Sequence, residues 1–192
     1  YFMKHFKNFK TCVYCTAQTL ASLDETTLAR DYAYLEKYVG IDKVYLETYR
    51  DGTWVAIDHM KMIQNFFKKH GVEIAGGITT VTPPLEKDDV KRQRLFQTFC
   101  YSNEAMRTYL KKIVTYTAEL FDEIILDDFF FTSCTCDDCL RERSNLSWAE
   151  FRSKKMIDVA ENLVLKPAKL ANPSVKVTIK YPNWRESYHE TG

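Results

Sequence analysis

One pattern repeats along this chain of 192 residues and limits the folds open to it. A short run of β-branched and aromatic residues is followed by a loop, and then by a segment with an apolar residue at every third or fourth position. The pattern predicts strands at residues 11–16, 43–47, 72–78, 123–127 and 175–181. It predicts helices at residues 25–39, 56–69 and 102–120, and another that begins at residue 147. Strands and helices that alternate in this way indicate a parallel sheet with right-handed helical crossovers.

Two architectures accommodate a chain of this kind. A doubly wound sheet closes comfortably with a few strands, whereas a TIM-type (β/α)8 barrel typically needs about 250 residues. The loop after the first strand reads CTAQTLASLD and lacks the glycines of a nucleotide-binding loop, so a dinucleotide-binding fold is weakly supported. We therefore expect an α/β fold in which residues 1–192 form part of one catalytic-type (β/α)8 barrel. In this interpretation the chain supplies about the first five βα units and is truncated at its C-terminus.

The charge composition limits the kinds of partner that we expect for this chain. The 27 Lys and Arg residues nearly balance the 26 Asp and Glu residues, so charge gives no reason to expect nucleic acid or a membrane surface as a partner. No apolar run approaches the roughly 18–20 residues that a bilayer span requires. The chain begins with Tyr1 rather than methionine. If a signal peptide has been removed, we expect a periplasmic or extracellular protein, and otherwise a cytoplasmic one. The protein could also form a homo-oligomer.

Three cysteines lie close together after the fourth predicted strand. Cys134, Cys136 and Cys139 are near enough in sequence to bind one tetrahedral ion with bonds of about 2.3 Å. Cys100 precedes the helix that leads into that strand, so its loop can meet theirs on one side of the sheet. Four thiolates leave no open coordination position, which predicts a structural zinc ion.

Two alternatives to this metal site are metal binding by the other two cysteines and oxidation of the clustered cysteines to disulfides. Cys12 and Cys15 are three residues apart in a predicted strand, so they face opposite sides, lie about 10 Å apart and cannot both bind one ion. We expect them to be core or near-core residues. A disulfide knot is the other alternative for the cluster, but the spacing of Cys134 and Cys136 makes it awkward.

Two adjacent acids, Asp127 and Asp128, end the fourth predicted strand. Catalytic groups of parallel α/β folds lie at the carboxyl ends of strands. Because neighbouring strand residues face opposite sides, we expect one aspartate to act in catalysis or substrate binding and the other to support it. We place Asp128 first because it lies nearer the strand end. An Asx turn or a helix cap is the alternative interpretation.

Other strand ends carry carboxylates, amides and aromatic rings, which suit sugars because rings stack on sugar C–H faces and polar groups bind hydroxyls. The candidate substrate-binding residues follow the second and fifth predicted strands: Glu47, Tyr49, Arg50, Trp54, Tyr181, Asn183 and Trp184.

From residue 98 to residue 151 the sequence resembles the family 42 glycoside hydrolases, the barrel β-galactosidases, and looser relatives in their clan. The matching segments are FCYSNEAMRTYLKKIV, a strand that ends in acids, and CTCDDCLRERSNLSWAEF. The resemblance implies a barrel glycosidase whose structural zinc is held by Cys100, Cys134, Cys136 and Cys139.

The sequence departs from that family where the fourth strand ends. The family has an Asp-Asn-Glu type of motif there, whose glutamate is the general acid/base, and Phe129 takes that place after Asp127 and Asp128. Either an aspartate has taken the role, or another family shares the cysteine brace, or the barrel is inactive. The family's nucleophile comes from the seventh strand, which this sequence does not contain.

The sequence thus predicts a zinc-containing glycoside hydrolase that cleaves a glycosidic bond of an oligo- or polysaccharide by carboxylate acid/base catalysis. A non-catalytic carbohydrate-binding barrel is one alternative, favoured by Phe129. A metal-dependent hydrolase that binds a divalent ion through Asp127 and Asp128 is the other.

Overall fold

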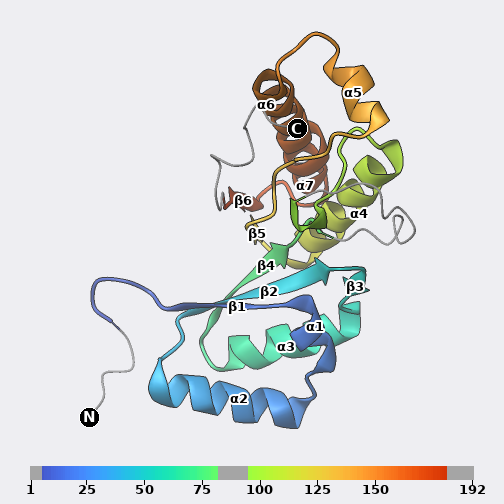
Figure 1. Cartoon of the computed structure of the whole chain (residues 1–192). Coiled ribbons are helices and arrows are strands. Elements are labelled where there is room, and N and C mark those ends of the chain that lie inside the picture. The colour runs from blue at the N-terminus through green and yellow to red at the C-terminus, as the bar shows by residue number, and fades with distance from the viewer. Residues whose placement is uncertain (1–5, 82–94, 181–192) are drawn as a thin grey trace.

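The computed structural model describes residues 6–81 and 95–180. Its centre is one sheet in which five strands run parallel (Figure 1). These strands are β1 (Cys12–Cys15), β2 (Lys43–Arg50), β4 (Glu73–Ile78), β5 (Glu123–Leu126) and β6 (Lys176–Ile179). A short sixth strand, β3 (Thr53–Trp54), pairs antiparallel with β2.

The order of the strands in the sheet follows their order in the chain. The sheet runs β1-β2-β4-β5-β6, so each parallel strand pairs with its neighbour in sequence. A doubly wound sheet instead reverses its order at a switch point. The parallel α/β fold expected from the sequence is therefore confirmed, and its consecutive order is the one found in (β/α)8 barrels.

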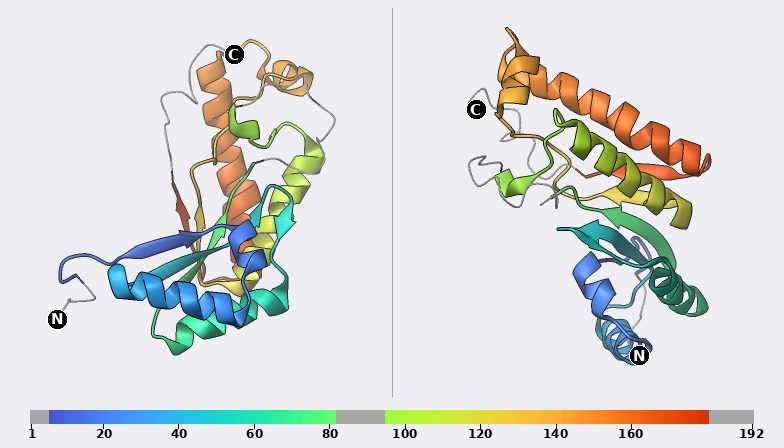
Figure 2. Two further views of the ribbon diagram at one scale, coloured as in Figure 1. Left: turned by 60° about the horizontal axis from the view of Figure 1, so that its bottom comes forward. Right: turned by 90° about the vertical axis from the view of Figure 1, so that its right-hand side faces the viewer.

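Helices connect the parallel strands. They are α1 (Ala17–Ser22), α2 (Glu25–Tyr38), α3 (Ile57–Lys69), the 3-10 turn η2 (Leu95–Gln97), α4 (Glu104–Leu120), α5 (Asp137–Arg143), and the continuous run of α6 (Trp148–Asp158), η3 (Val159–Leu165) and α7 (Lys166–Ala171). Helices α1, α2 and α3 lie beside β1 and β2, whereas α4 and the run from α6 to α7 lie beside β5 and β6 (Figure 2). In the part of the chain that the structure describes, no helix is long and apolar enough to cross a membrane.

Side chains at the helix starts explain where these helices begin. Asp24 and Ser147 each form a reciprocal capping box, which satisfies backbone N–H groups that the first helical turn leaves free. Asn103 caps α4 and accepts a hydrogen bond from the N–H of Met106 at 3.1 Å. The helix therefore begins at Glu104, two residues after the start predicted from the sequence.

Two adjacent glycines show how the two faces of the sheet differ. A Cβ atom on Gly76 would lie 2.6 Å from the side chain of Thr117 on α4, so this face packs against helices. A Cβ atom on Gly77 would lie 2.6 Å from the hydroxyl of Tyr14, on the opposite face. That opposite face is polar: Lys43 forms an ion pair with Glu123 across the strands at 2.5 Å. We call it the inner face of the sheet.

Candidate functional site

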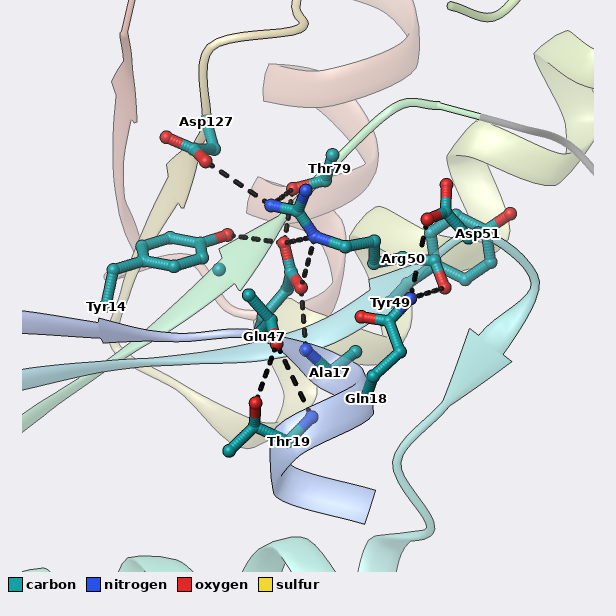
Figure 3. Close-up of polar contacts among 12 residues, drawn as sticks. Tyr14, Ala17, Gln18, Thr19, Glu47, Tyr49, Arg50, Asp51, Thr79 and Asp127 are labelled. Atoms are coloured by element: carbon teal, nitrogen blue, oxygen red, sulfur yellow. Dashed lines mark hydrogen bonds and ion pairs between the residues drawn. The ribbon is translucent and has the colours of Figure 1, made fainter. Parts of the chain in front are cut away.

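A buried carboxylate anchors the carboxyl end of the inner face. The side chain of Glu47, on β2, has no exposed surface. Its carboxylate accepts hydrogen bonds from the hydroxyl of Tyr14 at 2.8 Å and from the backbone N–H of Ala17 at 2.7 Å, and it also accepts one from the hydroxyl of Thr79 (Figure 3). A buried charge with several partners is held rigidly, because loss of any partner leaves an unpaired group away from water.

Arg50 neutralises this carboxylate and extends the network outward. Its Nε atom donates to both carboxylate oxygens of Glu47, at 3.0 and 2.9 Å. Its Nη2 atom donates to the hydroxyl of Thr79 at 2.9 Å and lies 3.5 Å from Oδ2 of Asp127 (Figure 3). Burial opposes the charge of Arg50, but the hydrogen bond and the charge of Glu47 outweigh it and raise the Arg50 pKa.

The two aspartates after β5 differ in exposure. The Asp127 side chain is 14% exposed and lies between Arg50 and Lys180, whose Nζ atom is 3.2 Å from Oδ1. The Asp128 side chain is 34% exposed and pairs with the same lysine at 2.8 Å. The hydrogen bond with Asp128, helped by the charges of both acids, raises the Lys180 pKa. The structure thus brings Glu47, Arg50, Asp127 and Asp128 together at one edge of the sheet.

An aromatic ring lies beside this network. Phe129 lies with its ring centroid 5.8 Å from the guanidinium carbon of Arg50 and 5.3 Å from the ring of Phe96, which is exposed. The carbonyl of Phe129 accepts a hydrogen bond from the hydroxyl of Thr80 at 2.8 Å. That bond fixes the start of the loop after β5 to the end of β4.

The four cysteines named from the sequence converge in one buried cluster. The sulfurs of Cys100, Cys134, Cys136 and Cys139 all lie within 4.8 Å of one another. Three of the separations, Cys100 to Cys136, Cys100 to Cys139 and Cys136 to Cys139, are 3.7 Å. All four thiols are free, so the disulfide alternative does not describe this structure.

The geometry of the cluster suits a metal ion. A tetrahedral ion with Zn–S bonds of about 2.3 Å keeps its sulfurs about 3.8 Å apart, close to the separations found here. Hydrogen bonds from Cys100 and Cys139 lower the pKa of the Cys134 thiol. The hydrogen bond to Cys134, more than burial, raises the pKa of the Cys100 thiol to about 12. A bound cation would displace the thiol protons, because the thiolate is the form that binds a metal. The cluster could therefore hold a metal ion.

The remaining cysteines lie away from this cluster. Cys12 is exposed, so it is not a core residue, whereas Cys15 is partly buried against the core. Burial, and then the charge of Glu47, raise the Cys15 pKa to about 11. Among the described residues, the four clustered cysteines form a group of three or more His, Cys, Asp or Glu side chains close enough to share an ion. Asp127 and Asp128 belong to no group of this kind in that part of the chain.

Two of the candidate substrate-binding residues lie elsewhere in the structure. Tyr49 is fully buried, and its ring packs against Trp54 and Tyr109 at centroid distances of 5.3 and 5.5 Å. The indole N–H of Trp54 donates to the hydroxyl of Tyr109, on α4, at 2.8 Å. These two rings therefore form part of the helix-facing core and do not reach the acids. Tyr181, Asn183 and Trp184 lie outside the described residues.

Three members of the network were not predicted from the sequence: Tyr14, Thr79 and Lys180. Thr79 and Lys180 each directly follow a strand, the same signal that pointed to Asp127. Tyr14 lies inside β1 and carries no such signal. Burial and the charge of Glu47 raise the Tyr14 pKa, so its hydroxyl remains a hydrogen-bond donor.

A parallel sheet whose consecutive strands are joined by helices, with acids and cations gathered at the carboxyl ends of the strands, places the chain in the α/β class. Comparison with known proteins gives the family: the model of the probable glycosyl hydrolase catalytic domain matches residues 1–192, and the chain belongs to this family. It is also 32% identical, over 210 aligned positions and 97% of its length, to the uncharacterized protein SSO3021 of Saccharolobus solfataricus. The chain spans 34% of the length of that relative. The match supports the predicted glycosidase class but does not single out family 42.

Proposed function

We propose that this chain forms part of a glycoside hydrolase that cleaves a glycosidic bond of an oligo- or polysaccharide by carboxylate acid/base catalysis. The observation that carries the proposal is the pair Asp127 and Asp128 at the carboxyl end of β5, in a chain that belongs to a glycosyl hydrolase family. Glycosidases of most families use two carboxyl groups, one of which protonates the leaving oxygen.

We propose further that the sheet is the first part of a (β/α)8 barrel. Two observations support this: the consecutive order of the parallel strands, and a relative about three times as long as the chain. In a barrel the inner face would line the interior, and the carboxyl ends of the strands would surround the substrate.

Asp128 suits the role of proton donor to the glycosidic oxygen. Its side chain is more exposed than that of Asp127, 34% against 14%, so a substrate reaches it more readily. Asp127, held between Arg50 and Lys180, suits a supporting role. The second catalytic carboxylate would come from another strand and would act as nucleophile or base.

We propose that the ion held by Cys100, Cys134, Cys136 and Cys139 is zinc and that it is structural. Four thiolates fill the tetrahedral positions, so no position remains for a water molecule or a substrate. An ion there would join the loop before α4 to the loop after β5, and the latter carries Asp127 and Asp128.

Release of reducing sugar from a panel of oligo- and polysaccharides tests the proposed activity in the full-length protein that contains this chain. The proposal predicts turnover of at least one substrate and its loss in the double variant Asp127→Asn/Asp128→Asn. Turnover that persists in the double variant would contradict the assignment of these acids.

One observation favours a second candidate, a carbohydrate-binding barrel without catalysis. Lys180 pairs with both acids, so neither is free of a cation in this structure. Calorimetric titration with the same saccharides separates the candidates: binding without sugar release supports the binding module, whereas sugar release supports the hydrolase.

A further inference from the structure

Arg50 joins the ends of three strands through its guanidinium group. From β2 it reaches Glu47 within its own strand, Thr79 just after β4 and Asp127 just after β5. The arginine side chain presents its N–H donors in a rigid planar fork. A single lysine Nζ atom is a point charge and cannot reproduce all of these directions.

The inner end of this connection is fully buried. Glu47 has no exposed surface, and its partners besides Arg50 are the Tyr14 hydroxyl, the Ala17 backbone N–H and the Thr79 hydroxyl. The bifurcated hydrogen bond from Nε to this carboxylate, together with the bond from Nη2 to the Thr79 hydroxyl, fixes the plane of the guanidinium group. The direction in which Nη2 meets Asp127 is therefore set inside the protein and not by solvent.

The contacts of Arg50 also argue against the role in substrate binding that its position in the sequence suggested. Its side chain is 19% exposed, and both Nε and Nη2 are engaged by protein oxygens. Asp127 lies at the outer end of the series Glu47, Arg50, Asp127, next to the more exposed Asp128.

We propose that Arg50 is a positioning residue: by linking buried Glu47 to Asp127, it holds the Asp127 carboxylate in the orientation that the site requires, beside the acid that meets the substrate. The inference rests on the proposed hydrolase function and adds to it the group that orders the site.

Steady-state kinetics of the full-length protein test the link. We expect Arg50→Lys and Glu47→Gln each to lower kcat by about 100-fold, because misplacing a group in an active site has effects of this order. We expect KM to change by less than about twofold, since neither residue contacts substrate. Because both act through one link, the double variant should lose no more than either single variant. A rise in KM at unchanged kcat, or multiplied losses in the double variant, would overturn the proposal.

Two matched variants control for general loss of stability. Arg107 is 19% exposed like Arg50 and pairs with an aspartate, Asp158, at 2.8 Å, but it lies on α4 away from the strand ends. Glu123 pairs with Lys43 at the opposite end of the inner face. Arg107→Gln and Glu123→Gln should leave kcat unchanged. A similar fall in kcat in these controls would assign the Arg50 effect to stability and overturn the proposal.

Crystal structures of the wild type and of Arg50→Lys and Arg50→Gln test the positioning role without an activity assay. A protein that hydrolyses no saccharide would refute the proposed function but not this role. We expect the Asp127 carboxylate to turn toward Lys180 when the arginine fork is absent. An unchanged Asp127 orientation in both variants would overturn the positioning role.

Discussion

Asp127 and Asp128 are neighbours in sequence with different surroundings. Asp127 has two cationic partners, Arg50 and Lys180, whereas Asp128 has Lys180 and more exposure to solvent. The prediction that one acid acts and the other supports it rested on the alternation of strand side chains. The division of roles stays a prediction, and each role can be tested at the level of single atoms.

Asp128→Asn should remove the proton donor while it keeps the size of the side chain. We expect kcat/KM to fall by about 10²–10⁴-fold on substrates with a poor leaving group. The loss should be much smaller on an aryl glycoside whose leaving group needs no proton. Rates on both substrate types check this, with Asp122→Asn, at the other end of β5, as the control. Equal losses on both substrates would exclude Asp128 as the acid.

Gly77→Ala should disturb the anchor beneath the acids. The added Cβ would lie 2.6 Å from the Tyr14 hydroxyl and 2.9 Å from its ring carbon Cζ, so the ring must move away from Glu47. Overpacking of this kind costs roughly 1–3 kcal/mol in the free energy of unfolding. Urea unfolding measures it, and Tyr14→Phe/Gly77→Ala should lose less than the sum of the single variants. A fully additive result would mean that Tyr14 is not the group displaced.

At the scale of the element, we expect the order of the loop after β5 to depend on metal binding at the cysteine cluster. We expect bound zinc in the wild type and a marked fall in both zinc content and Tm in Cys139→Ser, because metal binding contributes directly to folding at such sites. Cys12→Ser, which changes an exposed cysteine outside the cluster, is the matched control. Elemental analysis and thermal unfolding give both values. Equal zinc content in the two variants would contradict the assigned ligands.

The contact between α4 and the end of α6 should depend on pH. Burial opposes ionisation of Asp158, but hydrogen bonds from Arg107 and Asn162 outweigh it and lower the Asp158 pKa below its usual 3.8. A lowered pKa stabilises the fold at higher pH, and this contribution is lost as pH falls through the folded-state value.

Arg107→Gln should therefore cost stability at pH 7 and little at pH values well below 3.8. Because the Asp158 side chain is 39% exposed, solvent screens the pair and the difference should not exceed about 1 kcal/mol. Urea unfolding at both pH values measures it. A difference that does not shrink in acid would show that Arg107 acts through packing instead.

The elements predicted from the sequence are those with a strong hydrophobic period. The five parallel strands and the long helices were expected because a buried face imposes that period on a chain. Four short elements, α1, β3, η2 and α5, were not expected: α1 and α5 have at most seven residues, η2 has three and β3 has two. Elements of this length follow from local loop geometry and carry too few apolar positions to show a period.

The positions of Tyr49 and Trp54 could not be read from the sequence for a related reason. The pairing of β2 with β4 shifts register between Glu47 and Tyr49, so simple alternation fails at that point. Tyr49 turns toward α4, where it meets Trp54 and Tyr109. Glu47 and Arg50 do reach the acids, because the carboxyl ends of parallel strands share one edge.

At the scale of the whole molecule, the order of the strands explains why the acids and their partners lie together near the cysteine cluster. Consecutive parallel strands bring Glu47, Thr79 and Asp127 from β2, β4 and β5 to one edge. The cysteine cluster combines Cys100 from the loop before α4, Cys134 and Cys136 from the loop after β5, and Cys139 from α5. Residues far apart in the chain thus support the same acids, and the proposed barrel would close around them.

A crystal structure of the full-length protein with a bound, uncleaved oligosaccharide tests the central claim most directly. The account predicts that a carboxylate oxygen of Asp128 lies within hydrogen-bonding distance, about 2.6–3.2 Å, of the glycosidic oxygen. A saccharide bound away from the strand ends, or a divalent ion held by Asp127 and Asp128 in its place, would contradict it.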